Sequence, residues 1–359
     1  MLRVFEAFAG YGSQSIALRN LGIEYEVVAI SEIDKYAIKA YEAIHGPTNN
    51  LGDICKIDPS DIPDHDLFTY SFPCQDLSVA GKQAGLGKGT RSGLLYECEK
   101  IIEAKKPKYL LLENVKNLVG KKFKPQFDEW LEYLERLGYT NYWQVLNAKN
   151  YGVPQNRERV FVVSILGKHK SYEFPKPIPL DKCIANILED EVDEKYYINK
   201  PFHLVNKGHQ AELDIKGQDC IKRAYSTEKI APTLTTMQGG LREPKILTLP
   251  CICASRGRNP DNPSDRTPGA PTEQRLEFNT KGTSNTITTV QKDNYVVEPS
   301  YRIRKLTPRE CFRLMGMRDD NIDKIQAAGI SNTQQYKMAG NSIVVDVLEA
   351  IFKNLFMEG

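Results

Sequence analysis

One cysteine of the chain stands where a catalytic nucleophile could be held. Cys74 follows the apolar run 67–72 after Pro73, and a segment containing Gly and Ser continues to Gly93. A thiol fixed by a preceding proline and followed by a loop that could cover it suits covalent catalysis. Most single cysteines are inert small hydrophobic residues, so this position alone does not establish a nucleophile.

A carboxylic acid and two arginines could complete such a site. Glu113 stands near the end of the apolar run 108–115, where burial would raise its pKa and suit it to donate a proton. Arg157 and Arg159 lead into the run 159–166, and they could bind anionic or carbonyl oxygens or only pair with Glu158. This pattern favours acid–base chemistry beside the thiol.

A second group of residues could bind a nucleotide-like ligand. The segment Phe8-Ala9-Gly10-Tyr11-Gly12-Ser13 is a glycine turn after an apolar run, but the dinucleotide fingerprint needs a third glycine where this chain has Ser15. Glu32 and Asp53 follow the next strand-like run and its connection, and a carboxylate there can accept hydrogen bonds from a ribose. Together these features fit an adenosine-containing cofactor, whereas the turn alone could be structural.

These residues require a sheet that gathers strand ends at one edge. Short β-branched or aromatic runs at 2–5, 25–30, 67–72, 108–115, 142–146 and 159–166 alternate with amphipathic segments such as 127–137. The alternation predicts an α/β fold with a mostly parallel sheet and helices on both faces. A proline-rich stretch at 172–180 marks a domain boundary, and apolar positions from 344 to 355 predict a core-facing helix at the end of the chain.

Composition describes an ordinary globular protein rather than a collagen-like, disordered or membrane protein. The 359 residues include 48 Lys+Arg and 46 Asp+Glu. There is no apolar run long enough for a membrane helix and no secretory signal, so we expect a cytoplasmic protein without membrane association. The 8 cysteines and 5 histidines show no paired or ligand-like spacing, so we expect free thiols and no metal site.

The net charge of +2 hides an uneven distribution. Acidic side chains outnumber basic ones in residues 1–103, whereas basic ones outnumber acidic ones in residues 104–318. A basic stretch can bind a polyanion, although runs of charge are usually solvated surfaces.

Several of these motifs, in this order, resemble the DNA cytosine-5 methyltransferases. The resemblance rests on F-A-G-x-G, S-F-P-C-Q, L-E-N-V, Q-N-R-E-R, R-K-L-T-P-R-E-C-F-R-L-M-G and A-G-N-S-I, and it spans nearly the whole chain. It implies a Rossmann-like, S-adenosylmethionine-dependent methyltransferase fold with a smaller inserted target-recognition domain. The implied ranges are 1–175 for the catalytic and cofactor-binding domain, 176–330 for the target-recognition domain and 331–359 for a C-terminal segment that completes the catalytic domain.

The resemblance also implies roles for the candidate residues. Cys74 would add to C6 of a cytosine, Glu113 would supply a proton to N3, and Arg159 would hold O2. Arg157 would be a second cation of the same patch, and Asn114 would fix the turn at Pro73 and Cys74. S-adenosylmethionine, converted to S-adenosylhomocysteine, would be bound by Phe8, Gly10, Tyr11, Gly12, Ser13, Glu32, Ile33, Asp53, Ile54, Pro73, Leu94, Asn341 and Ser342.

Double-stranded DNA is the implied substrate, and a cytosine must leave the duplex to reach Cys74. The loop 75–91 would then cover the site, with DNA contacts from Gln75, Ser78, Lys82 and Arg91. Target recognition would involve Arg256, Arg258, Thr286 and Thr288, and the last two lie in Asn285-Thr-Ile-Thr-Thr-Val-Gln291. That segment resembles Pro232-Thr-Leu-Thr-Thr-Met-Gln238, which could be a scaffold duplicate or part of an enlarged reading surface.

Two alternatives to a DNA methyltransferase stay open on the sequence. A tRNA cytosine-5 methyltransferase would share the motifs, although the long basic insertion favours duplex DNA. A non-catalytic DNA-binding protein could retain the fold, but it would not need Cys74, Glu113 and Arg159. We further expect a monomer, and functional pairing with a restriction endonuclease is an open expectation.

Overall fold

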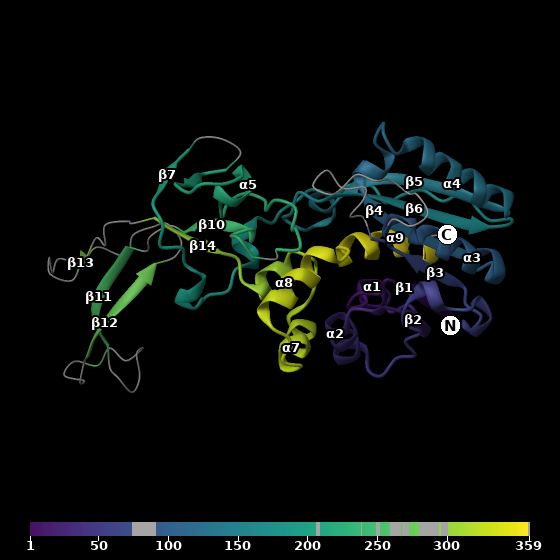
Figure 1. The fold of residues 1–359 in the computed structure, drawn as a ribbon. Helices are drawn as coiled ribbons and strands as arrows, with labels where there is room; N and C mark the ends of the chain where they lie inside the picture. Colours follow the sequence, from purple (N-terminus) through teal and green to yellow (C-terminus); the bar gives the residue numbers. More distant parts are fainter. Residues whose placement is uncertain are drawn as a thin grey trace. The chain divides into compact units, whose positions relative to one another are not determined.

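The computed structural model describes residues 1–73, 91–205, 209–237, 239–248, 252–258, 267, 273–279, 294–295 and 301–357. The chain forms two compact units (Figure 1). The first comprises Met1–Asp190, Glu228–Pro244 and Leu306–Gly359, and the second comprises Glu191–Thr227 and Lys245–Lys305. The C-terminal segment therefore returns to the unit that contains the N-terminus.

These units do not follow the expected boundaries at 175/176 and 330/331. Residues 176–190, 228–244 and 306–330 all belong to the first unit. Segment 306–330 contains α6 (Pro308–Arg313) and α7 (Asp319–Ala327), and Arg19 of α1 (Ser13–Asn20) donates a hydrogen bond of 2.9 Å to Asn321 of α7. The proline-rich stretch and the resemblance had suggested those boundaries, and neither encodes tertiary packing of this kind.

The first unit contains a six-stranded sheet in the order β2-β1-β3-β4-β6-β5. Strands β1 to β4 pair in parallel, whereas β6 runs antiparallel to both β4 and β5. The prediction of a mostly parallel α/β sheet is confirmed. The strands are β1 (Leu2–Ala7), β2 (Tyr25–Ser31), β3 (Leu67–Tyr70), β4 (Tyr109–Val115), β5 (Tyr139–Asn147) and β6 (Glu158–Leu166).

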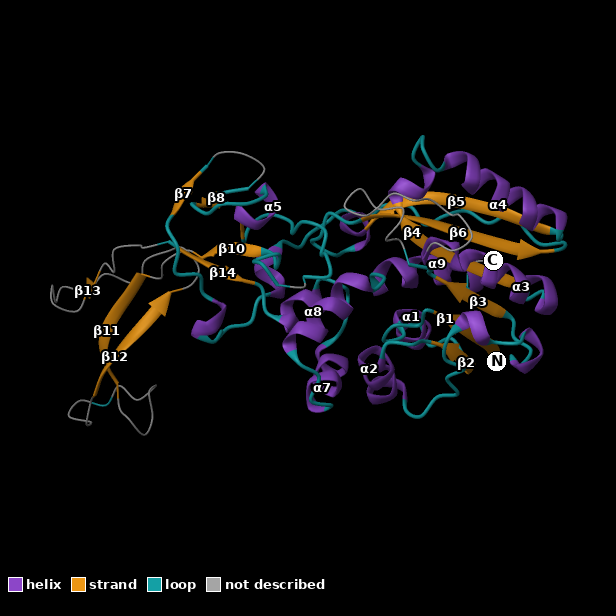
Figure 2. Ribbon diagram, in the orientation of Figure 1, coloured by secondary structure: helices purple, strands orange, loops and turns teal. Residues whose placement is uncertain are grey.

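Helices cover both faces of this sheet, as expected (Figure 2). On one face, Phe5, Phe68 and Leu110 share a core with apolar residues of α3 (Leu95–Lys105) and α4 (Lys124–Arg136). Because successive strand residues point to opposite faces, Glu6 points the other way and bonds to α1 and to α2 (Lys35–His45). The predicted C-terminal helix is α9 (Val345–Phe356), which packs against α1.

The second unit consists mainly of strands. One sheet has the order β14-β10-β9-β8-β7, and another has the order β12-β11-β13. Ala211, Leu213, Ala224, Leu247 and Ile303 form the buried core of the first of these sheets. The strands are β7 (Phe202–Leu204), β8 (Ala211–Leu213), β9 (Arg223–Ser226), β10 (Lys245–Thr248), β11 (Ile252–Arg258), β12 (Glu273–Asn279), β13 (Asn294–Tyr295) and β14 (Arg302–Lys305).

Short elements complete the two units. The remaining α-helices are α5 (Asp219–Lys222) and α8 (Asn332–Asn341). The 3-10 helices are η1 (Ile54–Lys56), η2 (Pro59–Asp61), η3 (Arg91–Leu94), η4 (Lys116–Val119), η5 (Ala148–Tyr151), η6 (Ile184–Ile187) and η7 (Glu194–Tyr196). No helix in the described ranges is both long enough and apolar enough to cross a membrane.

Candidate active site

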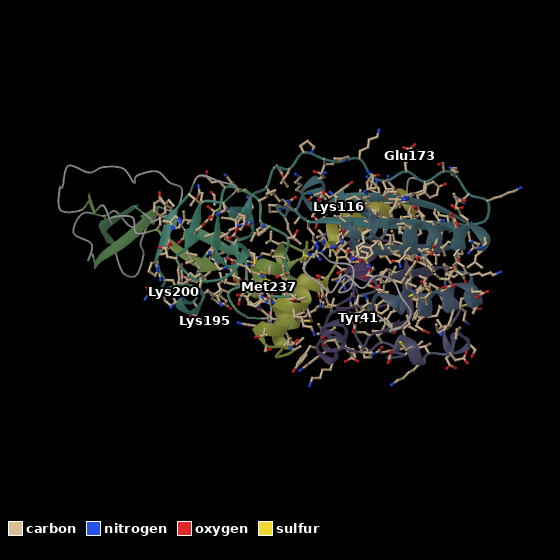
Figure 3. The ribbon with its side chains drawn as sticks, turned by 45° about the horizontal axis from the view of Figure 1, so that its top comes forward. Tyr41, Lys116, Glu173, Lys195, Lys200 and Met237 are labelled. Carbon is tan, nitrogen blue, oxygen red and sulfur yellow. The ribbon has the colours of Figure 1, made fainter. Side chains whose placement is uncertain are left out.

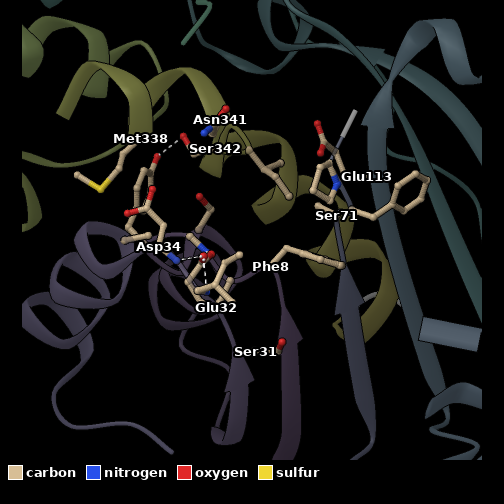
Figure 4. A pocket seen from close by; sticks show the side chains of 18 of the residues that line it. Phe8, Ser31, Glu32, Asp34, Ser71, Glu113, Met338, Asn341 and Ser342 are labelled. Atoms are coloured by element: carbon tan, nitrogen blue, oxygen red, sulfur yellow. Dashed lines mark hydrogen bonds between the residues drawn. The ribbon is translucent and has the colours of Figure 1, made fainter. Parts of the chain in front are cut away.

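A cavity of about 390 Å³ lies in the first unit, at the carboxyl ends of its parallel strands. Its walls come from the segments after β1, β2, β3 and β4, from the start of β6 and from the end of α8. Figure 4 shows Glu32 and Asp34 on one side of the pocket, Glu113 on the other, and Phe8 between them. Residues far apart in the sequence therefore meet at one sheet edge, as the α/β pattern predicted.

The cofactor side of the cavity, named here for the ligand predicted from the sequence, is built around Glu32. One carboxylate oxygen accepts the N–H of Gly10 at 2.9 Å, and the other accepts those of Ile33 and Asp34 at 2.8 Å. The glycine turn after β1 and the turn after β2 are thereby tied to one carboxylate. Charge-assisted bonds of this kind orient the group at the cavity wall.

Apolar surfaces flank this carboxylate. Ile33 is 73% exposed although it lines the cavity, whereas Ile54 is buried on the same wall. Phe8 has φ 56°, a left-handed conformation that costs energy for a residue other than glycine and is often found at functional sites. Pro73 and Leu94 line the same cavity. The wall offers flat, partly uncovered apolar surface that suits a planar ring.

Of the other expected cofactor residues, all except Gly12 line the cavity. Asp53 lines it while its carboxylate accepts the N–H of Cys55 at 3.1 Å, and Ser13 and Asn341 line it as well. The Tyr11 hydroxyl donates to Ser342 Oγ at 2.7 Å and so joins the first turn to the end of α8. Gly12 does not line it.

Gly12 faces α2 instead of the cavity. It adopts φ +79°, and a Cβ at this position would lie 2.5 Å from His45 Nε2 and 2.7 Å from Tyr41 Cε2. The position therefore requires glycine for both its backbone conformation and its close approach to α2. A direct contact of Gly12 with the cofactor, which the resemblance implies, stays a prediction.

The base side of the cavity, opposite, is built around Glu113 and Arg159. Because β6 runs antiparallel to β4, the start of β6 lies beside the end of β4, where Val115 pairs with Arg159. Arg159 Nε lies 3.1 Å from Glu113 Oε1. Glu113 is 8% exposed, and burial raises its pKa even though Arg159 and then Arg157 act in the opposite direction. Burial therefore makes this carboxyl group easier to protonate than an exposed glutamate.

Asn114 points away from Glu113 and stabilises the neighbouring turn. Its side-chain N–H donates to the carbonyl of Phe72 at 3.1 Å, and its side-chain oxygen accepts the N–H of Val115 at 2.9 Å. The first bond holds the backbone immediately before Pro73. This contact supports the prediction that Asn114 fixes the turn that carries Cys74, while Cys74 itself lies outside the described residues.

Arg157 bonds to the backbone of other segments around the cavity. Its side chain is buried, and its guanidinium donates to the carbonyls of Leu234 at 3.1 Å, Gly340 at 3.0 Å and Ser342 at 2.7 Å. Arg157 also lines the cavity and acts on the pKa of Glu113, so it belongs to one patch with Arg159, while a contact of Arg157 with the substrate stays a prediction. Because these backbone carbonyls accept its guanidinium N–H groups, Arg157 holds the backbone around the cavity in place.

Most of the predicted DNA contacts fall beyond what the structure describes. Gln75, Ser78, Lys82, Thr286 and Thr288 lie outside the described residues, as does Cys74. The backbone of Arg91 lies in η3 and those of Arg256 and Arg258 lie in β11, but their side chains are outside the described part. Among the described residues, no group of three or more His, Cys, Asp and Glu side chains could hold a metal ion.

Two charged residues of the cavity were missed by the sequence reasoning. Lys337 Nζ of α8 lies 2.6 Å from Asp34 Oδ2, and both residues line the cavity. Burial acts to raise the pKa of Asp34, but its bonds to Lys337 and to the Tyr36 N–H outweigh burial and lower it. Asp34 stands two positions after Glu32 and could have been noticed, whereas nothing in the sequence connects it with Lys337.

Comparisons with known proteins agree with this architecture. The family model described as C-5 cytosine-specific DNA methylase matches residues 2–357. The type II methyltransferase M2.ScrFI of Lactococcus lactis subsp. cremoris is 39% identical, and the match covers 99% of both chains. The orphan methyltransferase M.SPBetaI of Bacillus phage SPbeta is 37% identical over 99% of this chain and 97% of its own.

Solved structures show the same fold. The S. pombe Dnmt2 methyltransferase matches with a TM-score of 0.64 at 18% identity, covering 100% of this chain and 99% of that one. A Spodoptera frugiperda DNMT2 variant matches with a TM-score of 0.66, also at 18% identity, over 99% and 100% of the two chains. The fold follows from these structures, and membership follows from the family model and the curated relatives. The chain belongs to the C-5 cytosine-specific DNA methylases and is a DNA cytosine-5 methyltransferase.

Proposed function

We propose that the cavity binds S-adenosylmethionine and presents its methyl group to a cytosine held at Glu113 and Arg159. The Glu32 carboxylate is positioned to accept the ribose hydroxyls, and Phe8, Ile33 and Ile54 offer apolar surface to the adenine. Asp53 would accept the adenine amino group, while Ser13, Asn341 and Ser342 would surround the methionine portion. The cofactor supplies an electrophilic methyl group and leaves as S-adenosylhomocysteine.

The chemistry we propose for the base side depends on a buried acid and a partly buried cation that lie side by side. The observation that carries it is the Glu113–Arg159 pair at 3.1 Å, where burial raises the pKa of the carboxyl group. The protonated carboxyl would donate to cytosine N3, and the Arg159 guanidinium would donate to O2. Both contacts stabilise the negative charge that develops on the ring during attack at C6.

In this proposal Cys74 is the nucleophile. Its thiolate forms a bond to C6, electrons move toward N3, and N3 takes the proton of Glu113. C5 then takes the methyl group, a base takes the C5 proton as the thiolate is expelled and the C5–C6 double bond is restored, and N3 returns its proton to Glu113. The hydrogen bond from Asn114 to the Phe72 carbonyl supports this role, because it holds the backbone two positions before Cys74.

Duplex DNA with a defined target sequence is the proposed substrate. The family model and the curated relatives favour DNA over the tRNA alternative. Contacts from Gln75, Ser78, Lys82, Arg91, Arg256, Arg258, Thr286 and Thr288 stay predictions, as does the monomeric state. Pairing with a restriction endonuclease also stays a prediction, since the names of the relatives include both type II and orphan methyltransferases.

Bisulfite sequencing of DNA from cells that express the chain tests this function. We expect new 5-methylcytosine at one recurring sequence in the wild type and none in Cys74→Ser, while Cys74→Ser still binds S-adenosylmethionine. DNA containing 5-fluorocytosine should trap the wild type covalently, because fluorine at C5 blocks the final elimination. Substantial turnover by Cys74→Ser, or a wild type that leaves no methylated cytosine, would contradict the proposal.

A further inference from the structure

We call residues 231–237 the strap. They include most of the first of the two similar Thr-rich segments, 232–238. Its second copy, 285–291, lies outside the described residues. The strap belongs to the same compact unit as the cavity, although the flanking segments 191–227 and 245–305 belong to the other unit. Leu234 and Met237 of the strap are each 1% exposed, and Met237 is labelled in Figure 3. Its apolar side chains are thus buried in the core of the first unit.

The first half of the strap, 231–234, is bonded to the segment that carries the two arginines. Ala231 donates its N–H to the Pro154 carbonyl at 2.8 Å, and the Asn156 N–H donates to the Ala231 carbonyl at 2.8 Å. The Thr233 hydroxyl donates to the Asn156 carbonyl at 2.5 Å. The side-chain oxygen of Gln155 accepts the Leu234 N–H at 3.2 Å. Residues 154–157, just before Arg159, are therefore held by the strap.

The strap also approaches the end of α8 closely. A Cβ at Gly340 would lie 2.0 Å from the carbonyl oxygen of Thr235 and 2.9 Å from the N–H nitrogen of Thr236. These are backbone atoms, so no side-chain rotation could relieve the overlap. Gly340 directly precedes Asn341 and Ser342, which line the cofactor side of the cavity.

Arg157 connects all three segments. Its guanidinium reaches the strap at the Leu234 carbonyl and the end of α8 at the carbonyls of Gly340 and Ser342. One buried side chain therefore ties together the segment before Arg159, the strap and the segment that carries Ser342. A displacement of the strap would move both sides of the cavity.

We propose that the strap, Arg157 and Gly340 form a clamp that positions Arg159 for the base and Asn341–Ser342 for the cofactor. The first Thr-rich copy is then part of the scaffold of the active site. Arg157 is a positioning residue, because its contacts are to backbone carbonyls around the cavity. This inference rests on the proposed function of the cavity and extends it to residues outside the reacting groups.

Gly340→Ala is the most direct test, because alanine is favoured in a helix and only the contact with the strap opposes it. We expect kcat to fall about 10- to 100-fold, as for a small misplacement of catalytic groups, together with a several-fold rise in the cofactor KM. Thr333→Ala, an exposed change on the same helix, is the matched control and should stay within about twofold of wild type. Calorimetric binding of S-adenosylmethionine without DNA measures the cofactor side separately from turnover.

Thr233→Val is a second, milder variant that removes the bond to the Asn156 carbonyl while keeping the shape of the side chain. We expect about a 2- to 10-fold loss of kcat, the scale of one hydrogen bond, with the same set of methylated sites in bisulfite sequencing. The clamp is overturned if both variants keep wild-type kcat and cofactor KM, or if Thr233→Val changes the methylated sequence at unchanged kcat. A wild type that methylates nothing would instead contradict the proposed function.

Discussion

Two glutamates at opposite sides of one cavity have opposite surroundings. Glu32 accepts three backbone N–H groups, from Gly10, Ile33 and Asp34. Glu113 is buried beside Arg159, and burial raises its pKa. Backbone N–H groups can only donate, so they hold Glu32 as a fixed acceptor, whereas desolvation favours a proton on Glu113. The same residue type is thus prepared for binding at one strand end and for proton transfer at another.

This difference separates the expected effects of mutation. A change on the base side should lower the rate of the chemical step and leave cofactor binding intact. A change on the cofactor side should weaken cofactor binding and leave the rate at saturation largely intact. Only changes in the clamp should lower the rate and also weaken cofactor binding, because the clamp bonds to segments on both sides of the cavity.

Glu113→Gln should produce the largest effect. The amide keeps the size of the side chain but cannot deliver a carboxyl proton, so we expect kcat to fall about 10²- to 10⁴-fold. The S-adenosylmethionine dissociation constant, measured by calorimetry, should change by less than about threefold. Glu158→Gln is the control, because Glu158 lies at the same edge, pairs with Lys116 at 3.0 Å and does not line the cavity. A comparable loss of kcat in both variants would remove the special role of Glu113.

Glu6 of the same unit is also a buried carboxyl group, but unlike Glu113 it has no arginine among the described residues beside it to oppose the effect of burial on its pKa. Burial raises its pKa from 4.5 to about 7, although the hydroxyls of Ser15 and Tyr41 donate to it. Because the folded pKa exceeds the unfolded one, stability is fully present below about pH 4.5 and is lost as the pH rises toward 7, by about 3 kcal/mol. Urea unfolding at pH 5 and pH 8 measures this loss.

Glu6→Gln should flatten that pH dependence, since the amide does not titrate. Glu26→Gln, an exposed change on β2, should keep the wild-type slope. If wild type and Glu6→Gln lose the same stability between the two pH values, Glu6 is not the titrating group.

Glu32→Gln should weaken the cofactor side by a smaller amount. The amide replaces one carboxylate oxygen with a donor, which would face a backbone N–H and offer one acceptor fewer to a ribose. Hydrogen bonds to charged groups are worth about 1.5–3 kcal/mol, so we expect cofactor affinity to fall about 10- to 100-fold. At saturating cofactor kcat should stay within about threefold of wild type. A loss of kcat without a loss of affinity would reverse the roles assigned to the two sides.

Local patterns predicted the elements well because short apolar runs and amphipathic spacing are properties of neighbouring residues. The strand that ends just before Glu32, the strand that carries Glu113 and the helix α9 were all anticipated. Arg157 could not be placed in this way, because its partners Leu234 and Gly340 are 77 and 183 positions away. The antiparallel direction of β6, which brings Arg159 to Glu113, and the glycine requirement at Gly340 likewise depend on packing that no local pattern encodes.

Lys337→Met should give the smallest effect and define the limit of the cofactor side. Lys337 pairs with Asp34 across 303 positions of sequence, at 2.6 Å and with both side chains partly exposed. Partly exposed ion pairs contribute up to about 1 kcal/mol and weaken with salt, so we expect the cofactor KM to rise about two- to fivefold at low salt, and less at high salt, with kcat unchanged. Lys100→Met removes a similar pair with Glu97 on α3, which lies away from the cavity, and should leave KM unchanged. A fall in kcat for Lys337→Met would mean that α8 positions the base side too, and the separation between the two glutamates would then be incomplete at this helix.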